Sequence, residues 1–587
     1  MSHTFRVWAP KAATGVDVLL RDGGDDDGGG GGRRVAMEDA GGGWWQADVG
    51  DAGPGTRYSF SIDGGPGRPD PRSMSQPDGI DGPSEVVDHG AFEWTDDGWR
   101  GVPLASSVVY ELHVGTFTPE GTFVAAIEKL PHLASLGVDV VELLPVAEFS
   151  GDRGWGYDGV DLFAPHHAYG GPDGLKRFVD AAHEAGIAVV IDVVYNHLGP
   201  AGNYLSEFGP YFTDKYATPW GLAVNVDAAG SDEPRRFFVD NALMWLRDYH
   251  ADGLRLDAVH AIVDMSAVHL LEQIGLEVEA LEVELGRDLF LIAETDLNDP
   301  RIVSRREVGG YGIDAQWNDD FHHCLHTILT GERAGYYESF GSIQQLATAY
   351  TRGFVFAGEH DAHRGRRHGR APVGIPAWRF LGYLQNHDQV GNRAKGERSS
   401  HLLSTDQLRL AAALVLTSPF VPMLFMGEEW GATSPFQYFT DHPDPDLGRA
   451  VSEGRRSEFS YFGWAPEDVP DPQDPATFER SKLRWEERED EPHASLLAWH
   501  RELIALRRSR RELGPGRFDD VEVNVSADEG WIVVGRGGVV IAANLSDRTV
   551  EVPVPQGKTR VLASSPRISD VSHGVVELVR SGVVLLD

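Results

Sequence analysis

The sequence predicts an α/β protein, a (β/α)8 TIM barrel with a β-sandwich domain on each side of it along the chain. Its 587 residues exceed what one ordinary core can hold, so several domains are expected. Between residues 105 and 511, eight short apolar strands appear, with helical segments between most of them. Both flanking stretches instead show short alternating runs separated by Gly, Asp and Pro turns, as β-sandwiches do.

These changes of rhythm set the expected domain limits. Residues 1–93, with runs such as HTFRVWAP and RYSFSIDG, are assigned to an N-terminal β-sandwich, and residues 94–104 to a linker. The catalytic barrel is expected over residues 105–511, and a C-terminal β-sandwich over 512–587. Residues 198–231, after the third strand, form an unusually long segment rich in Gly, Pro, Tyr and Trp. We expect this segment to be a functional loop, because structureless loops of that length are uncommon otherwise.

The eight barrel strands are expected where apolar runs are bounded by turn residues. In chain order they are SSVVYELHV, VDVVELLPV, IAVVIDVVYNH, GLRLDAV, DLFLIAET, GIDAQWND, RFLGYLQNHD and VPMLFMG. Most are almost wholly apolar, which is typical of parallel strands covered on both faces. Eight such units favour a closed barrel over an open sheet.

Charge and composition exclude several classes of partner. The formal net charge of −38 disfavours nucleic acid and anionic membranes. No apolar run approaches the roughly 20 residues of a membrane span, and the N-terminus lacks a signal segment, so a cytoplasmic protein is expected. Cys324 is the only cysteine, which rules out an intrachain disulfide and a thiolate zinc cluster.

Polar residues gather where the predicted strands end. Arg255 and Asp257 have the same parity on the fourth strand, so both are expected to face the barrel axis. Glu294 ends the fifth strand and Asp388 the seventh. Arg255 and Asp257 alone could form a structural ion pair. Glu294 and Asp388, however, have no cation at their own strand ends, and such crowding of carboxylates is tolerated mainly where catalysis needs it.

Paired carboxylates suit the cleavage of a glycosidic bond. The stretches DVVYNH, GLRLDAVH, AET and NHD, in this order, resemble the α-amylase family of glycoside hydrolases and transglycosylases over residues 105–510. FRVWAPKA is similar to the β-sandwich that precedes the barrel in branching and debranching enzymes. The stretches GWGYDGVDLFAPHHAYGGP, QWNDDFHH and QNHDQVGNRA narrow the resemblance to the maltooligosyl trehalose trehalohydrolases of this family.

This resemblance implies a role for each catalytic group. Asp257 would be the nucleophile, oriented by Arg255, Glu294 the acid and base, and Asp388 the stabiliser of the transition state. In a retaining enzyme of this kind, the two reacting carboxyl groups are expected about 5–5.5 Å apart. The implied substrate-binding residues are Tyr157, His197, Arg255, His260, Asp319, Asp320, His322, His323, His387, Gln389 and Asn392. Trp155, Trp220, Trp430, Phe436 and Phe439 could either stack on sugars or pack in the core.

The implied function is hydrolysis of the α-1,4 bond next to the terminal trehalose of a trehalose-capped maltooligosaccharide, after a maltooligosyl trehalose synthase has acted. No cofactor is expected. A metal site at His322, His323 and His326 is the less favoured alternative to a polar sugar pocket. A related α-glucan-active hydrolase or branching enzyme is the main functional alternative, although Thr295 after Glu294 disfavours branching. A non-catalytic glycan-binding protein is disfavoured because all three carboxylates are present.

Overall fold

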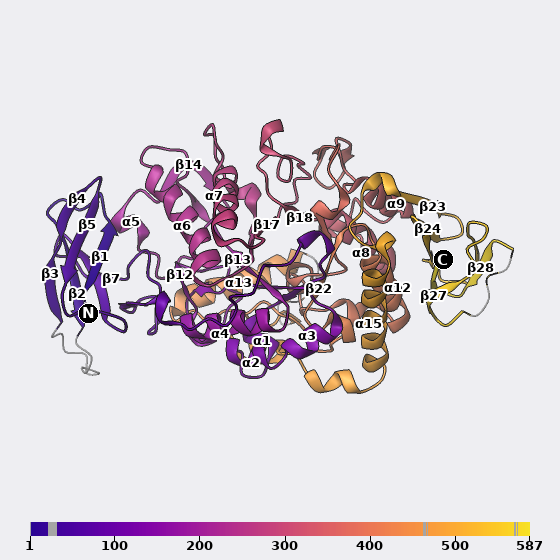
Figure 1. The fold of residues 1–587 in the computed structure, drawn as a ribbon, viewed down its shortest axis with the longest axis horizontal. Coiled ribbons are helices and arrows are strands. Elements are labelled where there is room, and N and C mark those ends of the chain that lie inside the picture. The colour runs from indigo at the N-terminus through magenta and orange to yellow at the C-terminus, as the bar shows by residue number, and fades with distance from the viewer. Residues whose placement is uncertain (1, 22–31, 462–464, 466–467, 569–570, 572) are drawn as a thin grey trace.

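The three expected parts of the chain lie in sequence order along its long axis (Figure 1). The structure, a computed structural model, describes residues 2–21, 32–461, 465, 468–568, 571 and 573–587. The strands near the N-terminus occupy one end of the molecule, the barrel the centre and the strands near the C-terminus the other end (Figure 1).

The N-terminal strands form two antiparallel sheets. One contains β1 (His3–Trp8), β5 (Trp44–Val49) and β4 (Glu38–Gly41). The other contains β3 (Arg33–Ala36), β2 (Val16–Arg21), β6 (Arg57–Ile62), β7 (Gly67–Arg68) and β8 (Ser84–Glu85). In β2, Val16, Val18 and Leu20 are buried while the residues between them are partly exposed. This alternation is what the strand period of two requires when one face covers a core.

Eight parallel strands close into the predicted barrel. In order around it they are β9 (Val109–Leu112), β10 (Val140–Leu143), β13 (Ala188–Val193), β16 (Gly253–Leu256), β17 (Phe290–Ala293), β18 (Ala315–Trp317), β21 (Phe380–Gly382) and β22 (Val421–Phe425). The last strand pairs with the first, so Leu424 lies opposite Tyr110. The predicted fold class is therefore confirmed.

Helices surround the barrel strands. The long ones are α4 (Gly171–Glu184), α6 (Asp232–Asp248), α7 (Leu270–Leu285), α8 (Asp319–Thr330), α9 (Ile343–Arg352), α12 (Thr405–Leu416), α13 (Pro445–Tyr461) and α15 (His493–Ser509). The short ones are α1 (Val114–Phe117), α2 (Phe123–Ile127), α3 (Leu130–Leu136), α5 (Leu205–Phe208), α10 (His387–Gly391), α11 (Ser399–Leu402) and α14 (Pro475–Ser481).

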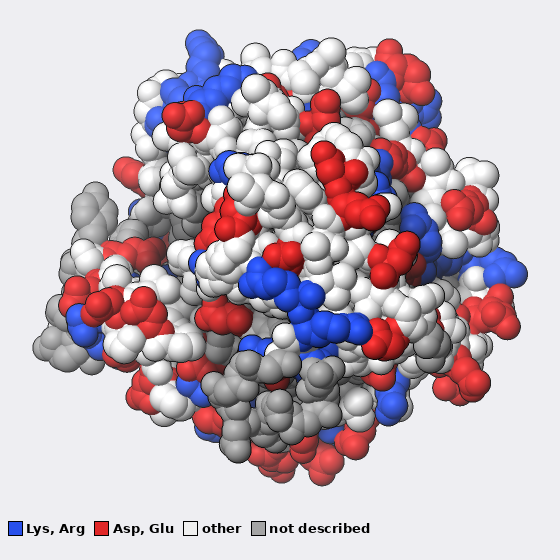
Figure 2. Space-filling model, turned by 90° about the vertical axis from the view of Figure 1, so that its left-hand side faces the viewer, with Lys and Arg blue, Asp and Glu red and all other residues white. Residues whose placement is uncertain are grey.

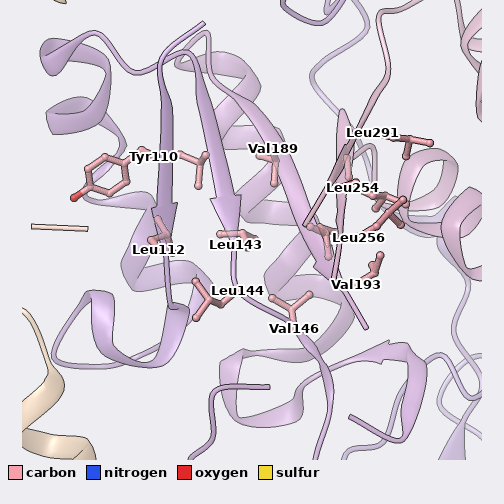
Figure 3. Packing of buried hydrophobic residues seen from close by; sticks show 14 of the residues in the cluster. Tyr110, Leu112, Leu143, Leu144, Val146, Val189, Val193, Leu254, Leu256 and Leu291 are labelled. Atoms are coloured by element: carbon pink, nitrogen blue, oxygen red, sulfur yellow. The ribbon is translucent and has the colours of Figure 1, made fainter. Parts of the chain in front are cut away.

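The pleat of the barrel strands separates apolar from polar side chains. Leu254 and Leu256 belong to the large apolar cluster between strands and helices, and Figure 3 shows them grouped with Val189, Val193 and Leu291. Arg255, between the two leucines, has the opposite parity and points to the barrel interior. Truncating a buried leucine of this layer to alanine typically costs about 2–5 kcal/mol. The apolar face of each strand thus fixes which residues reach the axis.

The segment after β13 is not the structureless loop that the sequence suggests. Residues 198–231 contain α5 and a hairpin of β14 (Phe212–Thr218) and β15 (Gly221–Val224). The N-terminal sheets brace this segment from outside. Arg68 donates two hydrogen bonds to the carboxylate of Glu207 (2.9 and 2.7 Å), and Lys11 Nζ donates to Ser206 O (2.6 Å).

The C-terminal strands form a second pair of sheets. β23 (Val521–Ser526), β24 (Trp531–Arg536), β25 (Val539–Asn544), β29 (Val583–Leu586) and β27 (Val561–Ser565) make one, and β26 (Val550–Pro553) pairs with β28 (Val575–Leu578). Arg536 Nη1 donates to Thr417 O and Ser418 O at the barrel (3.0 and 2.6 Å). Buried carbonyls are paired in this way across the contact.

The predicted linker 94–104 is also docked rather than free. Trp99 Nε1 donates to Asp252 Oδ1 (2.6 Å), directly before β16, and its ring stacks on His183. On the end face of the molecule in Figure 2, acidic side chains are scattered among uncharged ones, with a short band of basic side chains near the middle. Within the described residues, no helix has the length and apolar character to cross a membrane.

Candidate active site

The predicted catalytic carboxylates lie at the C-terminal ends of barrel strands or just beyond them. Asp257 directly follows β16, and Glu294 directly follows β17. Asp388 differs from the prediction in its setting, because β21 ends at Gly382 and Asp388 belongs to the first turn of α10. The side chain of Asn386 caps that helix by accepting from the backbone N–H of Asp388.

Arg255 is the cation at the centre of the site. Its Nη1 donates to Asp257 Oδ1 (2.7 Å) and to Asp192 Oδ2 (2.8 Å), while Nη2 lies 3.8 Å from Glu294 Oε2. Arg255 is completely buried against these carboxylates, so the structure does not support its predicted place among the substrate-binding residues. Its guanidinium instead orients the carboxylates through charge-assisted hydrogen bonds.

Asn196 completes the support of Asp257. Its Nδ2 donates to Asp257 Oδ2 (2.7 Å) and to the backbone oxygen of the same residue (3.0 Å). Its Oδ1 lies 2.5 Å from His197 Nδ1, so one amide orients both the carboxylate and the imidazole. Asn196 was not among the predicted site residues, although its place in DVVYNH, beside His197, was the signal that could have found it.

Glu294 lies in a setting that favours its protonated form. Burial raises the pKa of Glu294 well above its usual range; Arg255 opposes the rise, and the charges of Asp257, Asp388 and Asp319 add to it. The backbone N–H of Ala258 donates to Glu294 Oε2 (2.6 Å). Ala258 has φ of 39°, a left-handed conformation that costs about 1–3 kcal/mol in a non-glycine residue and is concentrated at functional sites. No sequence signal marked Ala258.

Asp388 is the most exposed of the three carboxylates, with 42% of its side chain accessible. Asn392 Nδ2 donates to its Oδ1 (3.1 Å), and His387 Nε2 lies 3.5 Å from the same oxygen. Burial lowers the pKa of His387, but the carboxylates of Asp388 and Glu111 outweigh it and raise the pKa to about 9. The structure thus brings Asp388, His387 and Asn392 together as predicted.

A cavity of about 570 Å³ opens beside this centre. Tyr157 and His197 line it, and Tyr157 Oη donates to Asp192 Oδ2 (2.6 Å) beneath. The rings of His197 and Trp220 stack with centroids 4.3 Å apart. Of the five aromatic candidates, Trp155 and Trp220 line the cavity. Trp430, Phe436 and Phe439 are completely buried and serve packing.

The start of α8 holds four further predicted residues, three of which line a small hollow. Asp319 accepts from Tyr383 Oη (2.6 Å) and Gln389 Nε2 (3.4 Å), and burial raises its pKa to about 7. Asp319, Asp320 and His323 line this hollow of about 20 Å³, together with Asp296 and Arg364. His260 lies exposed on the turn that follows Asp257.

His322 and Asp320 are both held by partners inside the protein, and the contacts of His322 contradict its predicted place in the sugar pocket. His322 is completely buried, with Nδ1 2.6 Å from Leu384 O and Nε2 2.8 Å from Tyr337 Oη, so it has no free nitrogen for a sugar. Asp320 Oδ2 accepts from Asn298 Nδ2 and from two backbone N–H groups at residues 355 and 356. Its carboxylate therefore anchors the neighbouring loop.

The alternative metal site at His322, His323 and His326 finds no support in these contacts, because His326 Nε2 is paired with Glu332 (2.6 Å). Among the described residues, one other group has metal-ligand spacing, Glu148 with His166 and His167. The carboxylate of Glu148 already accepts from His167 N (2.8 Å) and lies 2.7 Å from its Nδ1. His166 Nδ1 lies 3.2 Å from the same carboxylate.

Known proteins resemble the whole chain. Its residues 75–218 match the family model of the α-amylase catalytic domain, and residues 516–585 match a domain of unknown function. Over 575 residues it is 50% identical to the malto-oligosyltrehalose trehalohydrolase of Mycobacterium tuberculosis, with 97% of each chain covered. Over 585 residues it is 50% identical to that of Arthrobacter ramosus, with 98% of this chain and 100% of the relative covered.

The chain belongs to the malto-oligosyltrehalose trehalohydrolase family. The crystal structure of a provisionally assigned α-amylase from Salmonella typhimurium agrees with the fold, with a TM-score of 0.90, 41% identity, and 100% of this chain and 97% of that chain covered. The trehalohydrolase family and the α-amylase catalytic domain together confirm the predicted enzyme class, a glycoside hydrolase.

Proposed function

We propose that the enzyme hydrolyses the α-1,4-glucosidic bond next to the terminal trehalose of maltooligosyl trehalose and releases trehalose and a maltooligosaccharide. The names of the relatives support this substrate. One observation carries the chemistry: Asp257 and Glu294 approach the same guanidinium, Asp257 at 2.7 Å and Glu294 at 3.8 Å. Asp257 thus has a direct charge-assisted hydrogen bond, whereas the pKa of Glu294 is raised, mainly by burial.

The unequal settings assign the two steps of a retaining mechanism. Asp257 attacks the anomeric carbon while Glu294 protonates the oxygen of the departing trehalose, which leaves a glycosyl-enzyme. Glu294, now a carboxylate, then takes a proton from water, and that water cleaves the covalent bond with net retention. Asp388, beside His387, stabilises the positive charge that develops on the sugar ring.

The proposal assigns the two halves of the substrate to two regions of the site. The sugar at the cleaved bond contacts Tyr157 and His197, whose rings line the large cavity. The departing trehalose lies beyond Glu294, against the polar side chains near the start of α8 and the start of α10. The residues proposed for it are His260, Asp319, His323, Gln389 and Asn392.

The same proposal places the enzyme in a short reaction sequence. Its substrate must first acquire a terminal trehalose unit, so a maltooligosyl trehalose synthase must act before it. We propose that both steps take place in the cytoplasm, where the maltooligosaccharide product is again available to the synthase. No cofactor takes part in the proposed steps.

The proposal is tested with trehalose-capped and uncapped maltooligosaccharides of equal length. The capped substrate should be cleaved faster, and proton NMR during the first turnovers should detect free trehalose and a maltooligosaccharide whose new anomeric carbon is α. Equal rates on both substrates would indicate a general α-glucan hydrolase. New α-1,6 linkages would indicate a branching enzyme, and either result would overturn the proposal.

A further inference from the structure

Glu111 is a buried carboxylate beneath the active site to which neither the mechanism nor the sequence motifs give a role. It lies on β9, opposite Glu142 of β10, and both side chains are only 1% exposed. A carboxylate at this depth costs several kcal/mol unless it is paired and hydrogen-bonded. Burial, and then the charge of Glu111, raise the pKa of Glu142 well above its usual range, so Glu142 is neutral. Glu111 therefore needs a cationic partner of its own.

Glu111 holds His387 at two points. Its Oε1 lies 2.5 Å from His387 Nδ1, and its Oε2 accepts from the backbone N–H of His387 (3.0 Å). The two residues are 276 positions apart in the chain. Because His387 is the first residue of α10, this clamp fixes both the start of that helix and the orientation of the imidazole.

The ring of His387 cannot rotate away from this pairing. Its face stacks on Tyr157 with centroids 5.1 Å apart and an angle of 18°. Trp155 and Trp317 meet it edge-on, at 85° and 63°. With Nδ1 turned to Glu111, the second nitrogen, Nε2, lies 3.5 Å from Asp388 Oδ1 on the side of the reaction centre.

The charges around His387 come from several elements. Glu111 on β9 and Asp388 on α10 favour the imidazolium, whereas Arg255 on β16 and burial oppose it. Glu142 on β10 is neutral, and burial lowers the pKa of His113, which precedes α1, to about 3, so His113 is neutral too. Tyr157, the remaining ionisable neighbour, has its pKa raised well above its usual range by burial. The carboxylates prevail, and the pKa of His387 is about 9.

We infer that Glu111 is a positioning residue for the hydrolysis: through its two contacts with His387 it keeps that imidazole cationic, with the Nε2–H directed at Asp388 and the sugar. His387 then acts only as a donor, and Glu294 remains the group that exchanges a proton with the leaving oxygen. The inference rests on the proposed function for the role of Glu294. It assigns Glu111 no contact with substrate.

The test compares the pH dependence of kcat in the full-length enzyme and its E111Q variant. Glutamine can still accept from the backbone N–H of His387 but carries no charge. The pKa of His387 should fall from about 9, although Asp388 still raises it. A fall to the usual 6.5 would lower kcat at about pH 8 roughly thirtyfold, the ratio of the two protonated fractions, so a loss of up to that size is expected. The alkaline limb of the profile, to which the deprotonation of Glu294 also contributes, should move to lower pH.

Two variants control for loss of folding and for a general effect of substituting a buried glutamate inside the barrel. E111D retains the charge and should restore the wild-type alkaline limb even if its rate is lower. E142Q makes the same substitution at the same depth, on a residue that is already neutral, and should leave the limb in place. An E111Q enzyme that is slower with an unmoved limb would mean a purely structural role. An equal shift in E142Q would also overturn the inference.

A second measurement uses the wild-type enzyme alone. An aryl maltooligoside with a nitrophenol leaving group needs no proton from Glu294, so its alkaline limb should follow His387 and lie near pH 9. If the wild-type enzyme showed no alkaline limb on this substrate over the pH range in which it stays folded, the inference would be overturned. This test does not depend on whether E111Q folds. Trehalose is scored separately in each reaction, so failure of the proposed substrate is distinguishable from failure of the pH prediction.

Discussion

The strand ends and the start of α8 both carry runs of polar residues, but they use them differently. At β16 and β17, Asp257 and Glu294 both reach the reaction centre because every second residue of a barrel strand faces the axis. At α8, Asp319, Asp320 and His323 line a hollow, and Asp320 also anchors a loop, whereas His322 is inside the protein. A helix distributes consecutive residues around its axis, so adjacency in sequence does not imply a shared site.

The largest effect is expected when Asp257, at the end of β16, is substituted. In D257N the side chain keeps its size but loses its nucleophilic charge, so kcat should fall on the order of 10⁴-fold while maltooligosaccharide binding persists. Steady-state rates and calorimetric binding measure the two quantities. D314N is the matched control: Asp314 precedes β18 at the opposite end of the barrel, where its Oδ2 accepts from Leu291 N (2.9 Å). A D257N enzyme as active as D314N would contradict the assignment.

A change of intermediate size is expected in the pH profile, and it should distinguish Asp319 from its neighbour Asp320. Glu294 must be protonated to act as an acid, so activity falls as the pH rises through its raised pKa, to which the charge of Asp319 contributes. D319N removes that charge, lowers the pKa of Glu294 and should move the alkaline limb to lower pH by roughly half a unit. Below about pH 7 the difference should vanish, because Asp319 itself is then protonated.

D320N is the partner experiment to D319N. Asp320 accepts from three donors of its surroundings, so its loss should lower the melting temperature and leave the alkaline limb where it is. Identical pH profiles of D319N and D320N would mean that the two carboxylates do not differ in their effect on Glu294.

The smallest expected effect on catalysis concerns His322. H322F removes two hydrogen bonds and leaves Leu384 O and Tyr337 Oη without this partner, which should lower the free energy of unfolding by about 1–3 kcal/mol. Thermal melting measures that loss, while kcat/KM should change less than twofold after correction for folded enzyme, about 0.4 kcal/mol. A large loss of kcat/KM in folded H322F would return His322 to the substrate-binding set.

The fold and the position of Asp257 and Glu294 at one end of the barrel could be predicted from the sequence because both depend on local periodicity. Parity along β16 predicts that Leu254 and Leu256 face outward and Arg255 inward, and the three side chains lie that way. Parity does not reveal that Arg255 is completely buried, because burial depends on neighbours from other strands. The contact of Glu111 with His387 is beyond local periodicity for the same reason, since 276 residues separate the two.

The brace between Arg68 and Glu207 has a consequence for how this enzyme can change. One wall of the large cavity contains Trp220, which belongs to the insertion that Arg68 of the N-terminal sheets holds through Glu207. Substitutions in the N-terminal sheets can therefore change substrate preference by shifting the insertion that contains Trp220. A shortened enzyme without the N-terminal sheets would lose the Arg68–Glu207 contact that supports this wall.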